Sequence, residues 1–289
     1  MRSVMSLGRW IGLGAVGALA TTAAVVAVAN TGQHHPAGVK LAAGSAASST
    51  RVAGKTAQFT GVWAPGSGTQ WWRTGMTAKQ FGWWNAHYTK QGLRIQDLRV
   101  SPGAKDYTAV WRPGTGAEKI RTGLTPSQFK AANTANAKKG LRIKSLSTGN
   151  GITAVWRPGH QKQTITVGLT TSPFATLLNA ESKKSMRPVL LDRYTAGGAW
   201  HFVSVFEPGT GDWQARTTTS PTVWHNDNMN YAKGGLRLVS LGSEPYTGLW
   251  RPGSGKWQVW TAPFATFMAD EAKFYKQGYR LVRIAKWTS

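Results

Sequence analysis

Residues 108–129 have the sequence TAVWRPGTGAEKIRTGLTPSQF, and parts of this stretch return along the chain. Closely related segments are TGVWAPGSG at 60–68, TAVWRPG at 153–159 and TGLWRPGSG at 247–255. Recurrence at a period of about 20 to 50 residues is typical of repeat architectures. The fold of this chain is therefore predicted from one repeating unit.

Two landmarks define that unit: the aromatic residue before each x-P-G turn, and the start of a GLR-like segment. The aromatic residues are Trp63, Trp111, Trp156, Phe206 and Trp250, at spacings of 48, 45, 50 and 44 residues. The GLR-like segments start 29, 29, 29, 29 and 28 residues later, at Gly92, Gly140, Ser185, Gly235 and Gly278. Length is nearly constant inside a unit and varies between units, as expected for five tandem repeats.

Each unit contains patterns for three strands and one helix. The alternating segment YTAVW predicts a strand that Arg-Pro-Gly ends, and the following KIRTG predicts the return strand of a hairpin. Thr125, Pro126 and Gln128 form a helix start with a capping box, which Thr77 and Gln80 repeat. The helix ends at Lys-Lys-Gly or Lys-Gln-Gly, and the alternating LRIKSL predicts the third strand.

The predicted fold is an α+β repeat protein of five ββαβ units, at about 57–104, 105–149, 150–199, 200–243 and 244–289. One unit has too little core to stand alone, so neighbouring copies must bury each other's faces. An open α/β solenoid and a closed five-fold α/β propeller both satisfy this requirement. Closure is favoured because it leaves no unprotected sheet edge.

The composition favours an anionic partner. The chain has 289 residues, and its 35 Lys and Arg outnumber 11 Asp and Glu, which gives a formal net charge of +24. The alternative is a basic exported protein without such a partner, because charge speaks to association and not to fold. The chain has no cysteine, which excludes disulfides, thiolate metal sites and cysteine nucleophiles. No cofactor is predicted.

The N-terminal segment has the layout of a secretory signal peptide. Arg2 and Arg9 precede an uncharged run over 10–29, which ends in an A-x-A site before Asn30. Residues 1–29 are therefore predicted to be a signal peptide, with an uncleaved membrane anchor as the alternative. Residues 30–56 are rich in Ala, Gly, Ser and Thr and predict a flexible linker.

The order of motifs VWRPGTG, RTGLTPSQF and KKGLRI resembles the bacterial tandem repeat domain of exported actinobacterial proteins. It is also similar to the repeats that precede the serine β-lactamase-like catalytic domain of polyglycine hydrolase-type proteases. The resemblance covers nearly all of residues 57–289. It implies an extracellular accessory or recognition role, names no ligand and transfers no catalytic residue.

Catalytic candidates are few. Ser127 and Lys130 match S-x-x-K, but Ser127 lies in a capping box and no K-T-G or S-D-N motif accompanies it. The fourth unit departs most from the repeat, and Asp192, His201 and Glu207 there define a possible metal or acid–base site. Decay of the repeat and a longer surface loop explain the same departures and are preferred. No catalytic or metal-binding residue is therefore predicted.

The candidate binding residues are arginines and tryptophans. One arginine column lies on the third strand and a second follows the strand aromatic: Arg94, Arg142, Arg187, Arg237 and Arg280, then Arg112, Arg157 and Arg251. In a ring each column would form a circle of guanidinium groups suited to phosphate, sulfate or carboxylate. The alternative is that each arginine bonds a backbone carbonyl or stacks on a tryptophan of the next unit. Trp71 and Trp72 cannot both face inward, so one of them is a candidate contact residue.

The predicted function is that of a secreted, non-catalytic repeat protein. The partner is an anionic polymer, a cell-wall glycan or an extracellular protein, and membrane contact involves only residues 10–29 if they are uncleaved. Two alternatives remain, an extracellular hydrolase or hydrolase-associated accessory, and a nucleic-acid binder, which predicted export disfavours.

Overall fold

The computed structural model describes residues 33–34, 57–101, 105–218, 220–242 and 246–288. The predicted signal peptide and almost all of the predicted linker lie outside these ranges. Five helices of 13 residues lie within them. They are α1 (Ala78–Lys90), α2 (Pro126–Lys138), α3 (Thr171–Lys183), α4 (Pro221–Lys233) and α5 (Phe264–Lys276). No helix in the described ranges has the length and apolar character needed to cross a membrane.

The strands repeat the order strand, strand, helix, strand five times, which confirms the predicted succession of elements. A two-residue strand, β1 (Gln33–His34), precedes them. The others are β2 (Ala57–Pro65), β3 (Trp71–Met76), β4 (Leu93–Val100), β5 (Tyr107–Pro113), β6 (Lys119–Leu124), β7 (Leu141–Ser147), β8 (Ile152–Pro158), β9 (Thr164–Leu169), β10 (Met186–Ala196), β11 (Ala199–Pro208), β12 (Gln214–Thr217), β13 (Leu236–Leu241), β14 (Thr247–Pro252), β15 (Gln258–Pro263) and β16 (Tyr279–Thr288).

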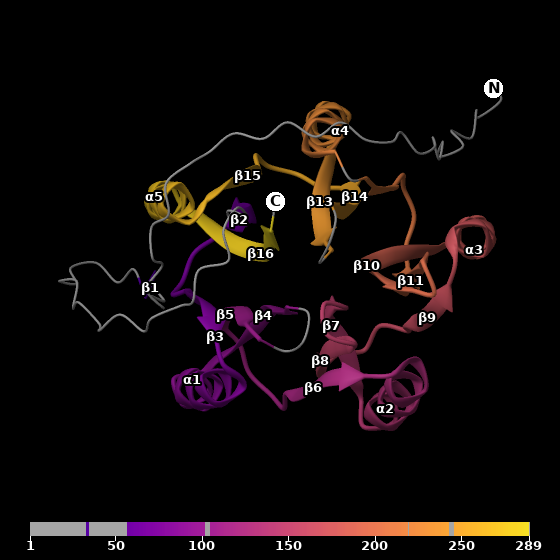
Figure 1. Cartoon of the computed structure of the whole chain (residues 1–289), viewed down its shortest axis with the longest axis horizontal. Helices are drawn as coiled ribbons and strands as arrows, with labels where there is room; N and C mark the ends of the chain where they lie inside the picture. Colours follow the sequence, from indigo (N-terminus) through magenta and orange to yellow (C-terminus); the bar gives the residue numbers. More distant parts are fainter. Residues whose placement is uncertain (1–32, 35–56, 102–104, 219, 243–245, 289) are drawn as a thin grey trace.

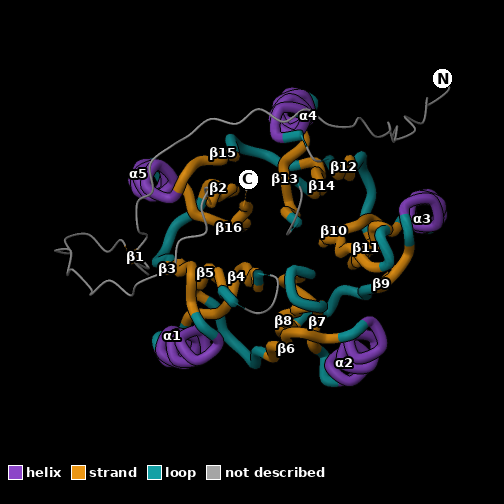
Figure 2. Tube along the Cα trace, viewed as in Figure 1, coloured by secondary structure: helices purple, strands orange, loops and turns teal. Residues whose placement is uncertain are grey.

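The described strands form five antiparallel sheets, which we number in chain order. Sheet 1 has the order β3-β5-β4 with β1 beside β3, and the others are β6-β8-β7, β9-β11-β10, β12-β14-β13 and β15-β2-β16. Figure 1 shows the five helices around the outside and the sheets around a common centre. The same view coloured by element shows loops running from each sheet to the next (Figure 2). The predicted α+β repeat architecture is confirmed.

The predicted hairpin after each x-P-G turn is wrong. The strand before the turn does not pair with the strand after it: β5 pairs with β3 and β4, while β6 pairs with β8 of the next sheet. The sheets are therefore out of phase with the predicted units, and each takes its middle strand from the following unit. The physical reason is that a lone unit cannot bury its own faces, so its return strand adds to the next copy.

The insertion before β11 also differs from expectation. It forms a long hairpin of β10 and β11 instead of a loop, with Thr195 opposite Trp200 and Ala196 opposite Ala199. The connecting residues Gly197 and Gly198 have φ values of 56° and 74°. A two-residue hairpin turn with both central residues at positive φ strongly favours glycine, and the sequence supplies two.

Strand β2 lies in the last sheet, although it comes first among the long strands. It pairs with β15 from Gln58–Pro263 to Trp63–Gln258, and with β16 from Ala57–Thr288 to Pro65–Tyr279. The described beginning and end of the repeat region therefore share one sheet. The Thr60 and Thr261 hydroxyls, 201 positions apart, are hydrogen-bonded at 2.7 Å.

Neighbouring sheets are also joined near the centre by side chains of the third strands. Leu98 N donates to Ser145 Oγ at 2.9 Å, and Thr148 N donates to Asp192 Oδ2 at 3.0 Å. The remaining three links are Leu191 N to Ser240 Oγ (3.1 Å), Arg283 Nε to Val239 O (2.9 Å) and Ile284 N to Asp97 Oδ2 (3.0 Å). These bonds connect sheets 1 and 2, 2 and 3, 3 and 4, 4 and 5, and 5 and 1.

The core is built from the two aromatic columns of the repeat. The strand aromatics are at most 1% exposed, and the helix aromatics Phe81, Phe129, Phe174, Trp224 and Phe267 are at most 7% exposed. Three strand tryptophans also donate their indole N–H to an asparagine of the helix that packs on the same sheet. These pairs are Trp111–Asn85, Trp156–Asn133 and Trp250–Asn228, at 2.9–3.0 Å. Each helix is thus fixed to its sheet by apolar burial and, in three sheets, by a partly buried hydrogen bond.

The predicted helix starts are confirmed. Thr77 and Thr125 cap α1 and α2, and both capping boxes, with Gln80 and Gln128, are formed. The side chain of Ser220 caps α4 in the same way, accepting a hydrogen bond from Val223 N. These three helices therefore begin where a local side chain satisfies one of their first free N–H groups, whereas α3 and α5 begin without a side-chain cap.

Candidate functional site

A pocket of about 670 Å³ lies at the end of the sheets where the third strands finish. Its walls come from the β4–β5 and β7–β8 ends of sheets 1 and 2, from β10 of sheet 3 and from β16 of sheet 5. A volume of this size suits a small molecule or one end of a polymer. Because four sheets contribute, no single repeat could form the pocket.

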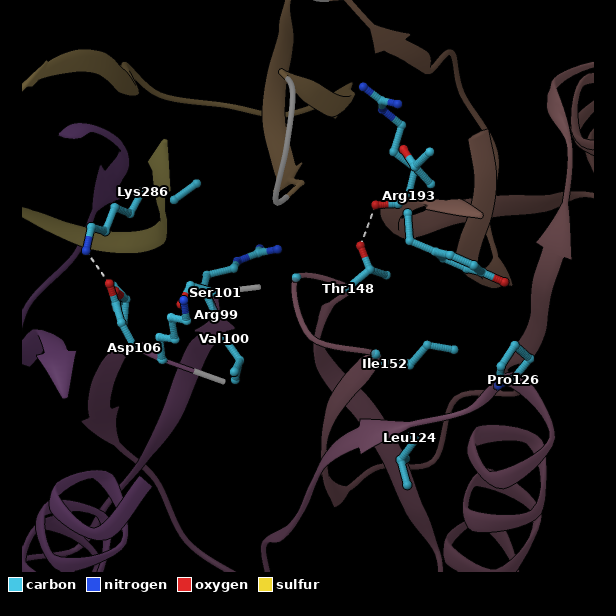
Figure 3. Close-up of a pocket in the computed structure, with 17 residues that line it drawn as sticks. Arg99, Val100, Ser101, Asp106, Leu124, Pro126, Thr148, Ile152, Arg193 and Lys286 are labelled. Atoms are coloured by element: carbon cyan, nitrogen blue, oxygen red, sulfur yellow. Dashed lines mark hydrogen bonds and ion pairs between the residues drawn. The ribbon is translucent and has the colours of Figure 1, made fainter. Parts of the chain in front are cut away.

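The charged side chains around the pocket are mainly cationic. They are Arg99, Lys105, Arg193 and Lys286, with Asp106 as the one carboxylate among the lining residues described. Figure 3 shows the Lys286–Asp106 ion pair on one side and Thr148 across from it, with the Arg99 side chain extending between them. Among the lining residues the cations therefore outnumber the carboxylate, and Lys105 forms no ion pair in the described structure.

Arg99 is held by two buried aspartates. Its Nη2 lies 3.1 Å from Asp97 Oδ1, its Nη1 lies 3.6 Å from Asp192 Oδ2, and Nη1 donates to Leu146 O at 3.0 Å. Both aspartates are fully buried. The guanidinium of Arg99 thus joins sheets 1, 2 and 3, and its hydrogen bonds fix its position beside the pocket.

Arg193 lines the pocket chiefly through its main chain. Its carbonyl accepts from the Thr148 hydroxyl, while its side chain runs toward β14, where Nε donates to Thr247 Oγ1 at 3.3 Å (Figure 3). The guanidinium stacks on Trp200 at 3.5 Å, and its Nη2 is buried without a hydrogen-bond partner in the described structure. Burial lowers the pKa of Arg193 to about 10, against the opposing effect of Asp192.

The two lysines complete the pocket. Lys105 is exposed, and Lys286 is ion-paired with Asp106. An ammonium group has three N–H donors, so Lys286 retains donors beyond the one it gives to Asp106. Lysines whose ammonium groups remain accessible can bind phosphate or carboxylate oxygens.

Sequence reasoning did not single out Arg99, Lys105 or Lys286. The third-strand position of Arg99 is occupied in the other units by Ser147, Asp192, Gly242 and Ala285. This position differs in every copy, whereas most neighbouring positions on the third strand are similar. This divergence at one position of an otherwise similar strand is the sequence signal that could have indicated Arg99 as a functional residue.

The predicted arginine column lies at the opposite end of the strands. Thr108 of β5 lines the pocket, and Arg112 of the same strand is four residues further on, about 13 Å away at roughly 3.3 Å per residue. Arg94 is directly opposite Arg112 in the sheet register. The pocket and the arginine columns are therefore two separate regions.

Each column arginine bonds backbone carbonyls in the same way. Arg94 Nε donates to Gly116 O at 3.0 Å, and its Nη1 donates to Thr89 O at 3.3 Å, near the end of α1. The equivalent bonds join Arg142 to Gln161 and Ala137, Arg187 to Gly211 and Ser182, Arg237 to Gly255 and Ala232, and Arg280 to Gly68 and Tyr275. These contacts tie each helix end to the loop after the x-P-G turn of the neighbouring unit.

The second arginine set reaches across sheet junctions. Arg112 Nη2 donates to Ser67 O of the preceding loop at 3.3 Å. A Cβ placed on Gly114 would lie 2.4 Å from Arg157 Nη2, and one on Gly209 would lie 3.2 Å from Arg251 Nη2. Burial lowers the pKa of all three guanidinium groups. Each of these loops therefore has an arginine of the third-strand column on one side and an arginine of the second set on the other.

The two adjacent tryptophans face opposite ways, as predicted. Trp72 is fully buried against Phe267, with ring centroids 5.3 Å apart. Trp71 is half-buried and stacks on Tyr88 at 5.0 Å. The more exposed aromatics are Trp83 and Trp260, at 59% and 51%.

The fourth-unit candidates do not converge. His201 and Glu207 lie near opposite ends of β11, about 20 Å apart at roughly 3.3 Å per residue. His201 Nδ1 contacts Gly168 O, Glu207 accepts from Gln163, and Asp192 lies within the buried cluster of Arg99. The described residues contain no group of three His, Asp or Glu side chains able to hold a metal. Ser127 lies beside Thr125 at the capped start of α2.

Glu118 offers a pH-dependent test of the junctions. Its Oε2 accepts from Ile95 N at 2.9 Å, and its Oε1 is buried without a hydrogen-bond partner in the described structure. In sheet 2 the equivalent Gln163 accepts from Ile143 N and also donates to Ile143 O at 3.0 Å. Burial raises the pKa of Glu118, with Ile95 N, Arg157 and Arg94 opposing.

We expect Glu118→Gln to stabilise the protein at neutral pH by about 1 kcal/mol, because the amide donates a bond that the carboxylate cannot. A raised folded-state pKa contributes stability at pH values below the unfolded pKa, and that contribution is lost as pH rises through the folded pKa. The gain should therefore shrink as pH falls toward 4, measured by urea unfolding across pH. Gln163→Glu is the reciprocal variant, and equal stability of all three proteins at pH 7 would contradict the argument.

The fold and the site together define an α+β repeat protein whose neighbouring repeats build a shared pocket. A family model described as polyglycine hydrolase-like, structural repeat, matches residues 69–113, 115–156 and 162–209. Residues 69–209 thus match polyglycine hydrolase-like structural repeats, which confirms the predicted resemblance for this part of the chain. Each matched segment starts at or near a return strand and ends at or near the next x-P-G turn, so it follows the sheets and not the predicted units. No curated protein matches the chain significantly.

Proposed function

We propose that this protein is a non-catalytic recognition module that binds an anionic ligand in the central pocket. The observation that carries the proposal is the lining of the pocket, where Lys105 is exposed without an ion pair in the described structure and Lys286 keeps N–H donors beyond its pair with Asp106. The net charge of +24 adds a long-range attraction for polyanions. Suitable ligands are polymers or glycans with phosphate, sulfate or carboxylate groups, or an extracellular protein with an acidic segment.

We also propose that the repeats close into a five-fold α/β propeller. Two observations support closure over an open solenoid. Strand β2 pairs with both β15 and β16, and side-chain hydrogen bonds link all five successive sheet pairs, including sheets 5 and 1. An open array would leave the first and last sheets without this contact. Closure also places the pocket at the centre of the ring, where several sheets reach one ligand.

The proposed setting is outside the cell. The signal-peptide pattern of residues 1–29 supports export, and an uncleaved segment would instead hold the repeats at a membrane surface. An exported module with a basic pocket suits acidic wall polymers and surface glycans. The family name adds a hydrolase-associated role as a possible context, with recognition assigned to these repeats.

The test is binding of the purified protein to wall teichoic acid, heparin, peptidoglycan, chitin and DNA at low and high salt. We expect at least one acidic polymer to bind, and a Lys105→Gln, Lys286→Gln variant to bind at least tenfold more weakly, because two charge-assisted contacts are lost. The control is Lys79→Gln, Lys90→Gln, which removes the same charge from exposed positions on α1. Equal weakening by both double variants would show that net charge alone attracts the polymer.

A further inference from the structure

The junction between sheets 5 and 1 holds two arginines around one loop. Arg280 Nε donates to Gly68 O at 2.7 Å, and Arg112 Nη2 donates to Ser67 O at 3.3 Å. A Cβ placed on Gly66 would lie 3.1 Å from Arg112 Nη2 and 3.5 Å from Arg280 Cγ. The two side chains therefore flank the same three loop residues, and Ser67 and Gly68 are exposed.

Two other junctions contain the same kind of pair. Arg94 and Arg157 flank Gly114, and Arg187 and Arg251 flank Gly209. In both, a glutamate opposes the repulsion between the arginines. Glu118 interacts favourably with Arg157, and Glu207 interacts favourably with Arg251. These two junctions show how the repeat accommodates paired guanidinium groups.

The junction of sheets 5 and 1 has neither glutamate. Gln70 occupies the position of Glu118, and its Oε1 accepts from Leu281 N at 2.6 Å. Ala64 occupies the position of Glu207, directly opposite Arg280 in the sheet register. No carboxylate of the described residues forms an ion pair with Arg112 or Arg280. Burial and the nearby Arg280 both lower the pKa of Arg112, and no acidic group opposes them.

Both arginines retain donors and are held in place. The hydrogen bonds of Arg280 use Nε and Nη1, and its guanidinium stacks on Tyr275 at 3.8 Å, so within the described structure Nη2 has no partner. Arg112 uses only Nη2 in the described structure. A guanidinium group has five N–H donors in a rigid fork that matches tetrahedral oxyanions. Restraint by the loop and the stacked ring reduces the entropy cost of binding.

We propose that Arg112 and Arg280 form a binding site for one phosphate or sulfate group at the junction of sheets 5 and 1, separate from the central pocket. The ligand takes the role that Glu118 and Glu207 have at the other junctions. It contacts both sheet 1 and sheet 5, so it also stabilises the contact between the two ends of the repeat region. Any ligand that binds only the folded protein raises its stability by mass action.

The experiment is thermal unfolding of the full chain in increasing inorganic phosphate or sulfate, with chloride at matched ionic strength as the reference. For the wild-type protein we expect a saturable rise in Tm with either oxyanion beyond the effect of chloride. Arg112→Gln should lower the apparent affinity for the oxyanion at least tenfold, judged from the oxyanion concentration needed to raise Tm. The matched control is Arg157→Gln at the junction that contains Glu118. Its Tm should depend on oxyanion concentration as that of the wild-type protein does.

A third variant tests the charge argument without removing an arginine. Ala64→Glu places a carboxylate opposite Arg280, as Glu207 lies opposite Arg187, and should abolish the oxyanion-dependent rise while the protein stays folded. The same titration in a Lys105→Gln, Lys286→Gln background removes the contribution of the central pocket, and the difference between the parent protein and its Arg112→Gln or Ala64→Glu variant should persist there, which separates this site from the central pocket. The proposal is overturned if Tm shows no oxyanion-specific rise, or if Arg112→Gln and Arg157→Gln respond alike.

Discussion

A chain that starts at residue 66, and so lacks β2, is expected not to fold into a stable domain. In the described structure β15 and β16 each pair with β2 and with no other strand, so its removal leaves both without a neighbour. It also removes three fully buried side chains, Phe59, Val62 and Trp63. At about 1.5–3 kcal/mol each, their burial is worth roughly 5–9 kcal/mol. This loss is comparable with the whole stability of a typical domain, about 5–15 kcal/mol.

The measurement is circular dichroism with thermal unfolding, compared with a chain that starts at residue 57. The longer chain keeps β2 (57–65) and the loop 66–70 that leads to β3, and it should unfold cooperatively. The shorter chain should show little cooperative unfolding. A synthetic peptide of residues 57–68 should restore a transition by adding a strand between β15 and β16. A cooperative transition of the shorter chain within a few degrees of the control would refute closure through sheet 5.

Asp97→Ala is expected to lower stability by about 3–5 kcal/mol. Asp97 is fully buried, pairs with Arg99, and accepts bonds from Ser145 Oγ and Ile284 N. It therefore contacts sheets 1, 2 and 5 at once. Its loss leaves Arg99 short of a counter-charge and Ile284 N without its acceptor, and breaking a buried ion pair from one side costs this much.

The measurement is the midpoint of thermal or urea unfolding. At about 2–4 °C per kcal/mol for a protein near this size, Tm should fall by roughly 6–20 °C. Asp212→Ala, at an exposed position, is the control and should change Tm by no more than a degree or two. The double variant Asp97→Ala, Arg99→Ala should be less destabilised than the sum of the single variants, because the charges are removed together. Simple additivity would show that the pair does not act as a unit.

Local sequence determined much of the fold. Thr77 with Gln80 and Thr125 with Gln128 placed the helix starts, because capping is a contact between residues three apart. The alternation around Arg94 and Arg142 placed the third strands, because strand faces alternate along the chain. In each case the signal and its structural cause lie within one repeat.

The phase of the sheets could not be predicted in the same way. A tandem repeat can be divided at any point without changing its pattern, so the order of motifs does not show which strands share a sheet. The turn after Trp111 has a hairpin-like sequence, yet the chain there passes to the next sheet. The partner of β5 is chosen by burial between copies, which is not encoded in the turn residues.

The central site was missed for a related reason. Arg99 and Lys105 lie at the β4–β5 end of sheet 1 and Lys286 lies in sheet 5, and only the arrangement of the sheets brings Lys286 to the same pocket. The prediction did note departures from the repeat in the fourth unit, and one of them, Asp192, lies in the cluster that holds Arg99. Its role there is to hold Arg99 and the neighbouring main chain, and neither His201 nor Glu207 approaches it.

The place of β2 in the last sheet also governs when the protein can be completed during biosynthesis. Trp287 donates its indole N–H to Thr60, 227 positions earlier, so the strand made first must wait for the strand made last. At about 5–20 residues per second, that wait is on the order of 10 to 45 s. Until then β2 has three large apolar side chains and two unpaired edges. A chaperone or export factor that holds the early part of the chain extended during this interval would protect it from aggregation.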